Sequence, residues 1–396
     1  KGFRSPATAC SPSFGLAWNV NNEKFLEPHR DAVSQFKLRA TYGLAGNDQI
    51  GNYQYIDSWR ISPFAYQGTP ALVPSRLFNP DYGWEVNRKL EAALELGFLK
   101  DRLLFTMAYF RNRSSNQLIR YTLPSQAGFT SVNRNFPALV QNKGLELTLD
   151  YKTAAGAKLG WQSSFNLSLN RNKLLSFPGL ANSSYAFNYV IGEPLNLVYT
   201  LQHAGLDSAG NFRQEDLNKD GLIGAADYAV TGHLDPPLYG GWQNSWQYKG
   251  WGFSFFIEFK KQKGRNYLAS LLNFPPGGML NQPSLVLDRW RQPGDQAPLA
   301  RYTASFGTPA YQSWSLLGAS NGIYSDASYI RLKNVHLFYA LPQKWFQRVA
   351  LSQSRLFVLA QNLYTWTRYR GADPEVQYLY ALPPLRTLSA GIYLTF

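Results

Sequence analysis

The segment 216–227 carries the residue types and spacing with the clearest metal-binding chemistry in this chain. It reads D-L-N-K-D-G-L-I-G-A-A-D, which places oxygen-bearing side chains at positions one, three, five and twelve of a twelve-residue loop. Ca²⁺ prefers oxygen ligands, and such a loop wraps them round one point, with a glycine at position six for the sharp turn. The sequence therefore predicts a structural Ca²⁺ site with five ligands: Asp216, Asn218, Asp220, the carbonyl of Leu222, and Asp227.

Two features of this loop differ from the usual calcium-loop pattern. Asp227 stands where a glutamate normally binds the ion through both oxygens, and its side chain reaches less far. The flanking sequence also lacks the periodicity of the paired helices that usually hold such a loop. A solvated acidic turn ahead of a strand is therefore an open alternative to a bound cation.

The residues that could support catalysis lack the spacing that catalysis needs. The single cysteine, Cys10, excludes an internal disulfide framework, and no serine lies in a G-x-S-x-G turn. The histidines are scattered, without metal-ligand spacing: His29, His203, His233 and His336. Three carboxylates are conceivable as an acid pair for glycoside cleavage, but such residues more often line a wet interior: Glu91, Glu95 and Glu146. The sequence predicts no enzyme.

The elements that must position these residues are strands, and the last one is the clearest. Within 385–396, one face is small or polar and the other is apolar, with period two. The apolar face consists of Leu388, Ala390, Ile392, Leu394 and Phe396. A strand of about ten residues with these two faces suits an outer-membrane β-barrel, because lipid touches one face and a wet lumen the other.

The same alternation recurs along the chain and predicts about eleven strands. Short connections alternate with long ones, which is typical of a barrel with short periplasmic turns and long extracellular loops. No run of about eighteen apolar residues is present, so a membrane-spanning helix is excluded. The predicted strands are 11–20, 36–43, 84–98, 103–118, 145–152, 161–170, 239–248, 252–267, 329–341, 355–369 and 385–396.

Charge and composition fit a membrane interface better than a nucleic-acid partner. The formal net charge is +14, but the 39 Lys and Arg residues are interleaved with 25 Asp and Glu residues and form no basic block. We expect no nucleic acid as a partner, and a basic surface that faces anionic lipid or lipopolysaccharide. The 15% aromatic content fits interfacial girdles as well as a sugar-stacking surface.

The strand count also has a consequence for closure. Bacterial single-chain barrels have an even number of strands, and an open sheet edge is not stable in lipid. We therefore expect residues 1–396 to form one half of a barrel, with the remaining strands outside these residues.

Four segments, in order, resemble the carboxyl-terminal half of the SusC-like (RagA-type) TonB-dependent transporters of Bacteroidetes. Segments 41–53 (T-Y-G-L-A-G-N-D-Q-I-G-N-Y) and 142–147 (N-K-G-L-E-L) are followed by 326–342 (D-A-S-Y-I-R-L-K-N-V-H-L-F-Y-A-L-P) and 361–375 (Q-N-L-Y-T-W-T-R-Y-R-G-A-D-P-E). The resemblance implies an all-β fold, a transmembrane antiparallel barrel of twenty-two strands. About eleven of these would come from this chain.

The resemblance also implies a function and partners. These would be TonB-dependent import of a glycan or oligopeptide across the outer membrane of a Gram-negative bacterium, with a SusD-like surface lipoprotein as lid. The plug and the TonB box would lie outside these residues. The long loops 44–83, 178–238 and 269–322 would supply the lid interface and part of the ligand cavity. Their aromatic residues could stack on the ligand or pack loop against loop: Tyr53, Tyr55, Trp59 and Trp314.

Two other classes of protein remain open from the sequence. A soluble or surface all-β carbohydrate-binding module without transport would carry similar aromatic loops. An outer-membrane enzyme barrel would need a catalytic triad or metal pair, and the sequence predicts none. The apolar row on nearly every strand favours the transporter.

Overall fold

The computed structural model describes residues 11–395, except 48–52, 54, 65–66, 80–81, 124, 130, 273–276, 280, 343, 345–352 and 379–380. Cys10 and Phe396 lie outside the described residues. None of the helices in the described part of the chain has the length and apolar character that a membrane-spanning helix requires. By their contacts the residues form two compact units, one of 1–101, 105–147 and 170–195, the other of 102–104, 148–169 and 196–396.

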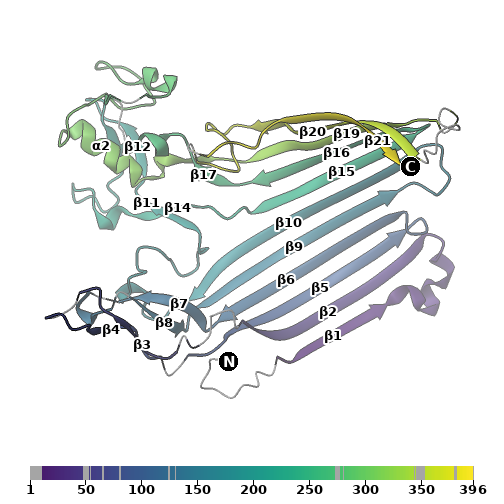
Figure 1. The fold of residues 1–396 in the computed structure, drawn as a ribbon, viewed down its shortest axis with the longest axis horizontal. Helices are drawn as coiled ribbons and strands as arrows, with labels where there is room; N and C mark the ends of the chain where they lie inside the picture. Colours follow the sequence, from purple (N-terminus) through teal and green to yellow (C-terminus); the bar gives the residue numbers. More distant parts are fainter. Residues whose placement is uncertain are drawn as a thin grey trace. The chain divides into compact units, whose positions relative to one another are not determined.

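Long strands dominate the structure and form one 11-stranded sheet (Figure 1). They pair in chain order, and among the described strands β1 and β21 each have one neighbour. The prediction of about eleven strands is confirmed. The strands are β1 (Ser13–Asn19), β2 (Val33–Asn47), β5 (Glu85–Phe98), β6 (Leu103–Ser115), β9 (Leu139–Lys152), β10 (Gly160–Ser176), β15 (Leu238–Tyr248), β16 (Trp251–Lys261), β19 (Tyr329–Ala340), β20 (Gln353–Thr367) and β21 (Thr387–Thr395).

The register gives each strand one apolar and one polar face. Phe255 of β16 lies opposite Val335 of β19, and Glu258 lies opposite Arg331 on the other face. The apolar rows are open to the surroundings, as for Ile392 of β21, which is 62% exposed. Rows of exposed apolar side chains opposite a polar face are what the strands of a membrane barrel need, with the apolar face toward lipid.

Glycines let large rings fit on the polar face. Gly252 lies opposite Phe338, and Gly391 lies opposite Phe357. A Cβ atom at either glycine would collide with the opposite ring. Each ring therefore covers the backbone of the neighbouring strand.

The shortest connection between neighbouring strands of the 11-stranded sheet, among the described residues, is the two-residue turn between β15 and β16. Both of its residues, Lys249 and Gly250, have positive φ, at 47° and 86°. This is the conformation that matches the twist of a tight antiparallel hairpin, and glycine adopts it without strain. The predicted strand 252–267 was too long, because β16 ends at Lys261 and residues 263–265 pair separately in β17.

The long connections contain their own hairpins and helices, which the sequence did not predict. The hairpins are β3 (Ser58–Ile61) with β4 (Leu72–Arg76), β7 (Gln117–Thr122) with β8 (Ser131–Phe136), and β12 (His203–Leu206) with β13 (Phe212–Gln214). Two further antiparallel pairs join strands that are not consecutive, β11 (Leu197–Thr200) with β14 (Ala229–His233) and β17 (Lys263–Arg265) with β18 (Tyr324–Asp326). The helices are α1 (Leu268–Leu271) and α2 (Pro309–Gly318), and short 3₁₀ helices include η2 (Lys24–His29) and η5 (Ala225–Asp227).

Each unit has its own hydrophobic core. In the second unit, Trp314 of α2 is 1% exposed and packs edge-on against Phe212 of β13, with ring centroids 4.8 Å apart. Leu299 and Leu317 complete the centre of this core. Of the two alternatives predicted for Trp314, ligand stacking or packing within the connections, the structure has the second, because an apolar core inside the connection takes up its ring. The core of the first unit consists of Phe136, Ala138, Val140, Leu174 and Phe177.

Candidate functional site

The predicted calcium loop is a tightly hydrogen-bonded turn. Asp216 accepts the Lys219 N–H at 2.7 Å through Oδ1 and the Gly221 N–H at 2.8 Å through Oδ2. Gly221 has a φ of +82°, which permits this reversal. The Asn218 side chain accepts the N–H of Asp220 at 3.1 Å. The chain therefore wraps from position one to position six as a calcium loop does.

Asp227 closes the loop from the inside. Its side chain is fully buried, and it accepts the N–H groups of Leu217 and Gly224, each at 2.8 Å. The hydrogen bond from the Gly224 N–H lowers the pKa of Asp227 below its usual range, although burial acts in the opposite direction. The buried carboxylate is therefore held in its charged form.

The backbone of 216–227 turns as in a calcium loop, but its carboxylates do not converge on one point. In the part of the chain that the structure describes, no three His, Cys, Asp or Glu side chains gather closely enough to hold a metal ion. The carboxylates of Asp216 and Asp227 are bonded to backbone N–H groups instead. The Ca²⁺ site on Asp216, Asn218, Asp220, Leu222 and Asp227 stays a prediction.

A second constellation, centred on Arg331, lies on the polar face of β19 and was not predicted. Arg331 is 1% exposed. Its Nη2 lies 2.6 Å from Asp373 Oδ2 and its Nη1 2.8 Å from Glu375 Oε2, and its Nε donates to Thr365 Oγ1 at 3.0 Å. A buried guanidinium that faces two carboxylates and a hydroxyl has its positive charge compensated. Arg331 therefore holds the connection that follows β20 against strand β19.

Neighbouring polar groups extend this attachment. Gln262, which is buried at the end of β16, donates through Nε2 to the carbonyls of Pro374 at 2.7 Å and Ala327 at 3.3 Å. Glu258 of β16, which comes before Gln262 in the chain, forms an ion pair with Lys333. The polar face of β16 and β19 is thus lined by opposite charges at the end where the long connections begin.

Two of the three predicted lumen carboxylates, Glu91 and Glu95, also form ion pairs. Arg39 of β2 bonds to Glu95 at 2.9 Å and to Glu91, both on β5. Two carboxylates held by one guanidinium lack the free acid and base that glycoside cleavage needs. Glu146 is exposed on β9. These groups form a charged, wet wall.

The β3–β4 hairpin of the first unit presents apolar side chains to the surroundings. Trp59 is 59% exposed, and Ile61, Phe64 and Leu72 are 69%, 81% and 64% exposed. Tyr53, before the hairpin, is 58% exposed. Of the four predicted aromatic residues, Tyr53 and Trp59 are thus accessible, Tyr55 is half-buried and Trp314 is buried.

Comparison with known proteins shows the family. Residues 1–363 match the family model described as "TonB dependent receptor-like, beta-barrel". The chain belongs to this family, whose members are β-barrels of the outer membrane of Gram-negative bacteria. The predicted resemblance, all-β fold and location are therefore confirmed.

Individual relatives extend the comparison. The chain is 27% identical to TonB-dependent receptor P3 of Formosa agariphila and 22% identical to TonB-dependent receptor SusC of Bacteroides thetaiotaomicron, over 93% and 92% of this chain. It spans 38% of the length of each. A structure of the RagAB peptide transporter matches with a TM-score of 0.81 and 23% identity, over 97% of this chain and 43% of that one. RagAB in its "open-open" state matches with a TM-score of 0.80.

Proposed function

We propose that residues 1–396 are the carboxyl-terminal half of a SusC-like transporter barrel that imports an oligomeric nutrient, a glycan or an oligopeptide. The carrying observation is the two-faced sheet, apolar on one side and lined by paired charges on the other, with folded connections at alternate strand ends. An apolar outer face and a wet inner face suit a lumen through which polar solutes pass. The exposed apolar rows argue against a soluble carbohydrate-binding module.

A surface lipoprotein of the SusD kind is the partner that we assign to the extracellular side. The β3–β4 hairpin supports this assignment, because four of its large apolar side chains are more than half exposed. Such a patch on an extracellular connection marks a protein interaction site. The TonB system would act through residues outside this chain.

A bound Ca²⁺ in the loop 216–227 is the cofactor that we propose, with a structural role. The supporting features are the wrap of Asp216 onto Gly221 and the ionised, buried Asp227. Binding would require the side chains of Asn218 and Asp220 to turn their oxygens toward the ion. The ion would stiffen the connection that leads from β13 to β14.

The test of the import function is growth of a strain that lacks the gene for this protein. Wild-type and deletion strains are grown on a panel of single oligosaccharides, polysaccharides and oligopeptide mixtures. We expect slow or absent growth on one nutrient class, restored by the complete gene. Equal growth on every nutrient, or recovery of the protein from the soluble fraction, would contradict the proposal.

A further inference from the structure

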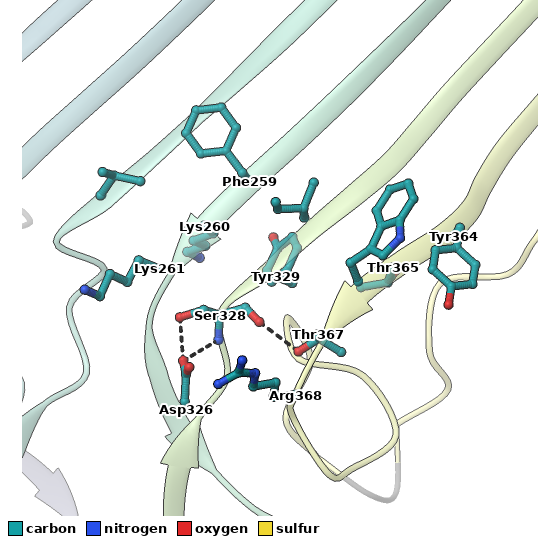
Figure 2. A pocket seen from close by; sticks show the side chains of 13 residues that line it. Phe259, Lys260, Lys261, Asp326, Ser328, Tyr329, Tyr364, Thr365, Thr367 and Arg368 are labelled. Carbon is teal, nitrogen blue, oxygen red and sulfur yellow. Dashed lines mark hydrogen bonds between the residues drawn. The ribbon is translucent and has the colours of Figure 1, made fainter.

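An open pocket of about 740 Å³ lies where β16 and β20 of the second unit end (Figure 2). Its lining combines apolar side chains of the sheet with cations at the strand ends. The nutrient-facing lumen does not account for it, because its apolar wall lies on the opposite face of the sheet. The question is what chemistry suits an apolar wall with a cationic rim.

The wall is a row of apolar side chains across three strands. Phe259 of β16 lies opposite Ile330 of β19, and Ile330 lies opposite Trp366 of β20. Ile330 and Trp366 are 48% and 50% exposed. Tyr364 packs edge-on against Trp366, with ring centroids 4.9 Å apart. This row continues the face that we assign to lipid.

The pocket lining carries three cations, Lys260, Lys261 and Arg368, and one carboxylate, Asp326. Lys261 is the last residue of β16, and Arg368 follows the last residue of β20. Between them, Asp326 accepts hydrogen bonds from the N–H and the hydroxyl of Ser328, as Figure 2 shows. The Ser328 hydroxyl chiefly lowers the pKa of Asp326, and the charges of Lys261 and Arg368 lower it further. The rim therefore has an excess of positive charge, and Lys261 and Arg368 are exposed, whereas Lys260 is half-buried.

The strand ends place this rim at a defined depth. The connections that follow β16 and β20 run from 262 to 328 and from 368 to 386, and long connections are extracellular in bacterial barrels. The apolar row then lies in the hydrocarbon of the outer leaflet, and Lys261 and Arg368 lie at the level of the lipid head groups. Lysine and arginine at this level keep their charge toward the head groups while their stems cover apolar surface.

We infer that this pocket binds a phosphate-bearing glycolipid of the outer leaflet. Its phosphate lies between Lys261 and Arg368, and an acyl chain lies along Phe259, Ile330 and Trp366. Arginine suits phosphate because its N–H groups match two phosphate oxygens, and lysine adds a point charge. Asp326 offsets part of this positive charge.

The test compares lipid binding by the complete transporter and by two double variants. The transporter, purified in a mild detergent, is titrated with lipid A from its own outer membrane and followed by native mass spectrometry. The rim variant is Lys261→Gln with Arg368→Gln. The control, Lys158→Gln with Lys249→Gln, removes the same charge from two exposed residues in short turns. We expect roughly tenfold weaker binding for the rim variant and unchanged binding for the control.

Further arms identify which part of the lipid is recognised. Lipid A from which phosphate has been removed should bind as weakly to the wild type as intact lipid A binds to the rim variant. Inorganic phosphate should not compete, and Ile330→Ser should weaken binding of the intact lipid. Equal binding by both double variants, or no effect of phosphate removal, would overturn the inference. A second transporter copy that covers the pocket and excludes lipid would overturn it too. The import proposal would stand in each of these cases.

Discussion

Arg331 shows how one buried charge can hold an extracellular connection. Its guanidinium is 1% exposed and meets two carboxylates that lie 42 and 44 residues further along the chain. Removal of one partner from a buried ion pair leaves an uncompensated charge, which costs several kcal/mol. The pairing therefore controls whether the connection 368–378 stays on β19.

We predict that Arg331→Met releases this connection. The buried Asp373 and its neighbour Glu375 would lose their counter-charge, which should lower the local opening free energy by about 3 kcal/mol. Hydrogen exchange of peptides that cover 368–378 measures the change in the complete transporter. Lys333→Met is the matched control, because the Lys333 side chain is 37% exposed and its pair with Glu258 should stabilise by less than about 1 kcal/mol. Equal exchange in both variants would show that Arg331 does not hold the connection.

The calcium proposal makes a second prediction at this scale. Millimolar Ca²⁺ should slow hydrogen exchange in peptides that cover 216–227, and EDTA should reverse the effect. Asp216→Asn and Asp227→Asn should each abolish the response. Asp207→Asn is the control, because Asp207 caps a separate turn through the N–H groups of Ala209 and Asn211. Identical exchange with and without Ca²⁺ would exclude the ion.

The charge state of Asp227 adds a pH dependence to the same loop. Its folded-state pKa is lowered, so its stabilisation of the loop is complete above the ordinary aspartate pKa of about 3.9. The stabilisation is lost as the pH falls through the lower, folded-state value. Exchange in 216–227, corrected for its intrinsic pH dependence, should rise only under such acidic conditions.

At the scale of elements, the strands were predictable from the sequence and the connections were not. Alternation identifies the strands because lipid and lumen select opposite residue types on the two faces of every strand. The burial of Trp314 depends on Phe212 and Leu299, and the role of Arg331 depends on Asp373. Such pairings join residues far apart in the chain, and no local period marks them. The tight turn at 216–227 was visible in the sequence because its oxygen-bearing side chains all lie within twelve residues.

The β3–β4 hairpin is the element that we expect to bind the lipoprotein lid. Trp59→Ser with Ile61→Ser should lower co-purification of the lipoprotein with the transporter by about tenfold or more, because exposed aromatic and aliphatic anchors dominate interface energies. Quantitative mass spectrometry of the detergent-extracted complex gives the ratio of the two proteins.

The control for the hairpin variant is Phe25→Ser. Phe25 is 63% exposed and belongs to η2, in the short connection between β1 and β2, which we place on the periplasmic side. An unchanged ratio in the hairpin variant, or an equal loss in the control, would rule out the hairpin as the lid site.

At the scale of the whole molecule, the sheet order predicts that further strands are needed. Among the described strands β1 and β21 lie at the two ends of the order, and this chain spans 38% of two relatives. Lipid cannot satisfy the free backbone groups of an open sheet edge. We therefore expect that the protein or complex that contains these residues in the membrane has more than twice their mass of 44.8 kDa.

Denaturing mass spectrometry of the extracted complex checks this expectation. One longer polypeptide, or a second one that adds a plug and the remaining strands, would agree with it. A membrane-inserted species of 44.8 kDa without further barrel strands would contradict the proposed half-barrel.

The edges at β1 and β21 also determine how these 396 residues should behave when they are expressed by themselves. An unprotected strand is a template for pairing with another chain, so the isolated polypeptide should self-associate and collect in inclusion bodies. Because of the same two edge strands, the polypeptide 1–396 could serve as one fragment of a split-protein assay. When the complementary fragment is supplied in trans, β1 and β21 should pair with its edge strands. Reassembly of the two fragments would then report barrel closure without any transported nutrient.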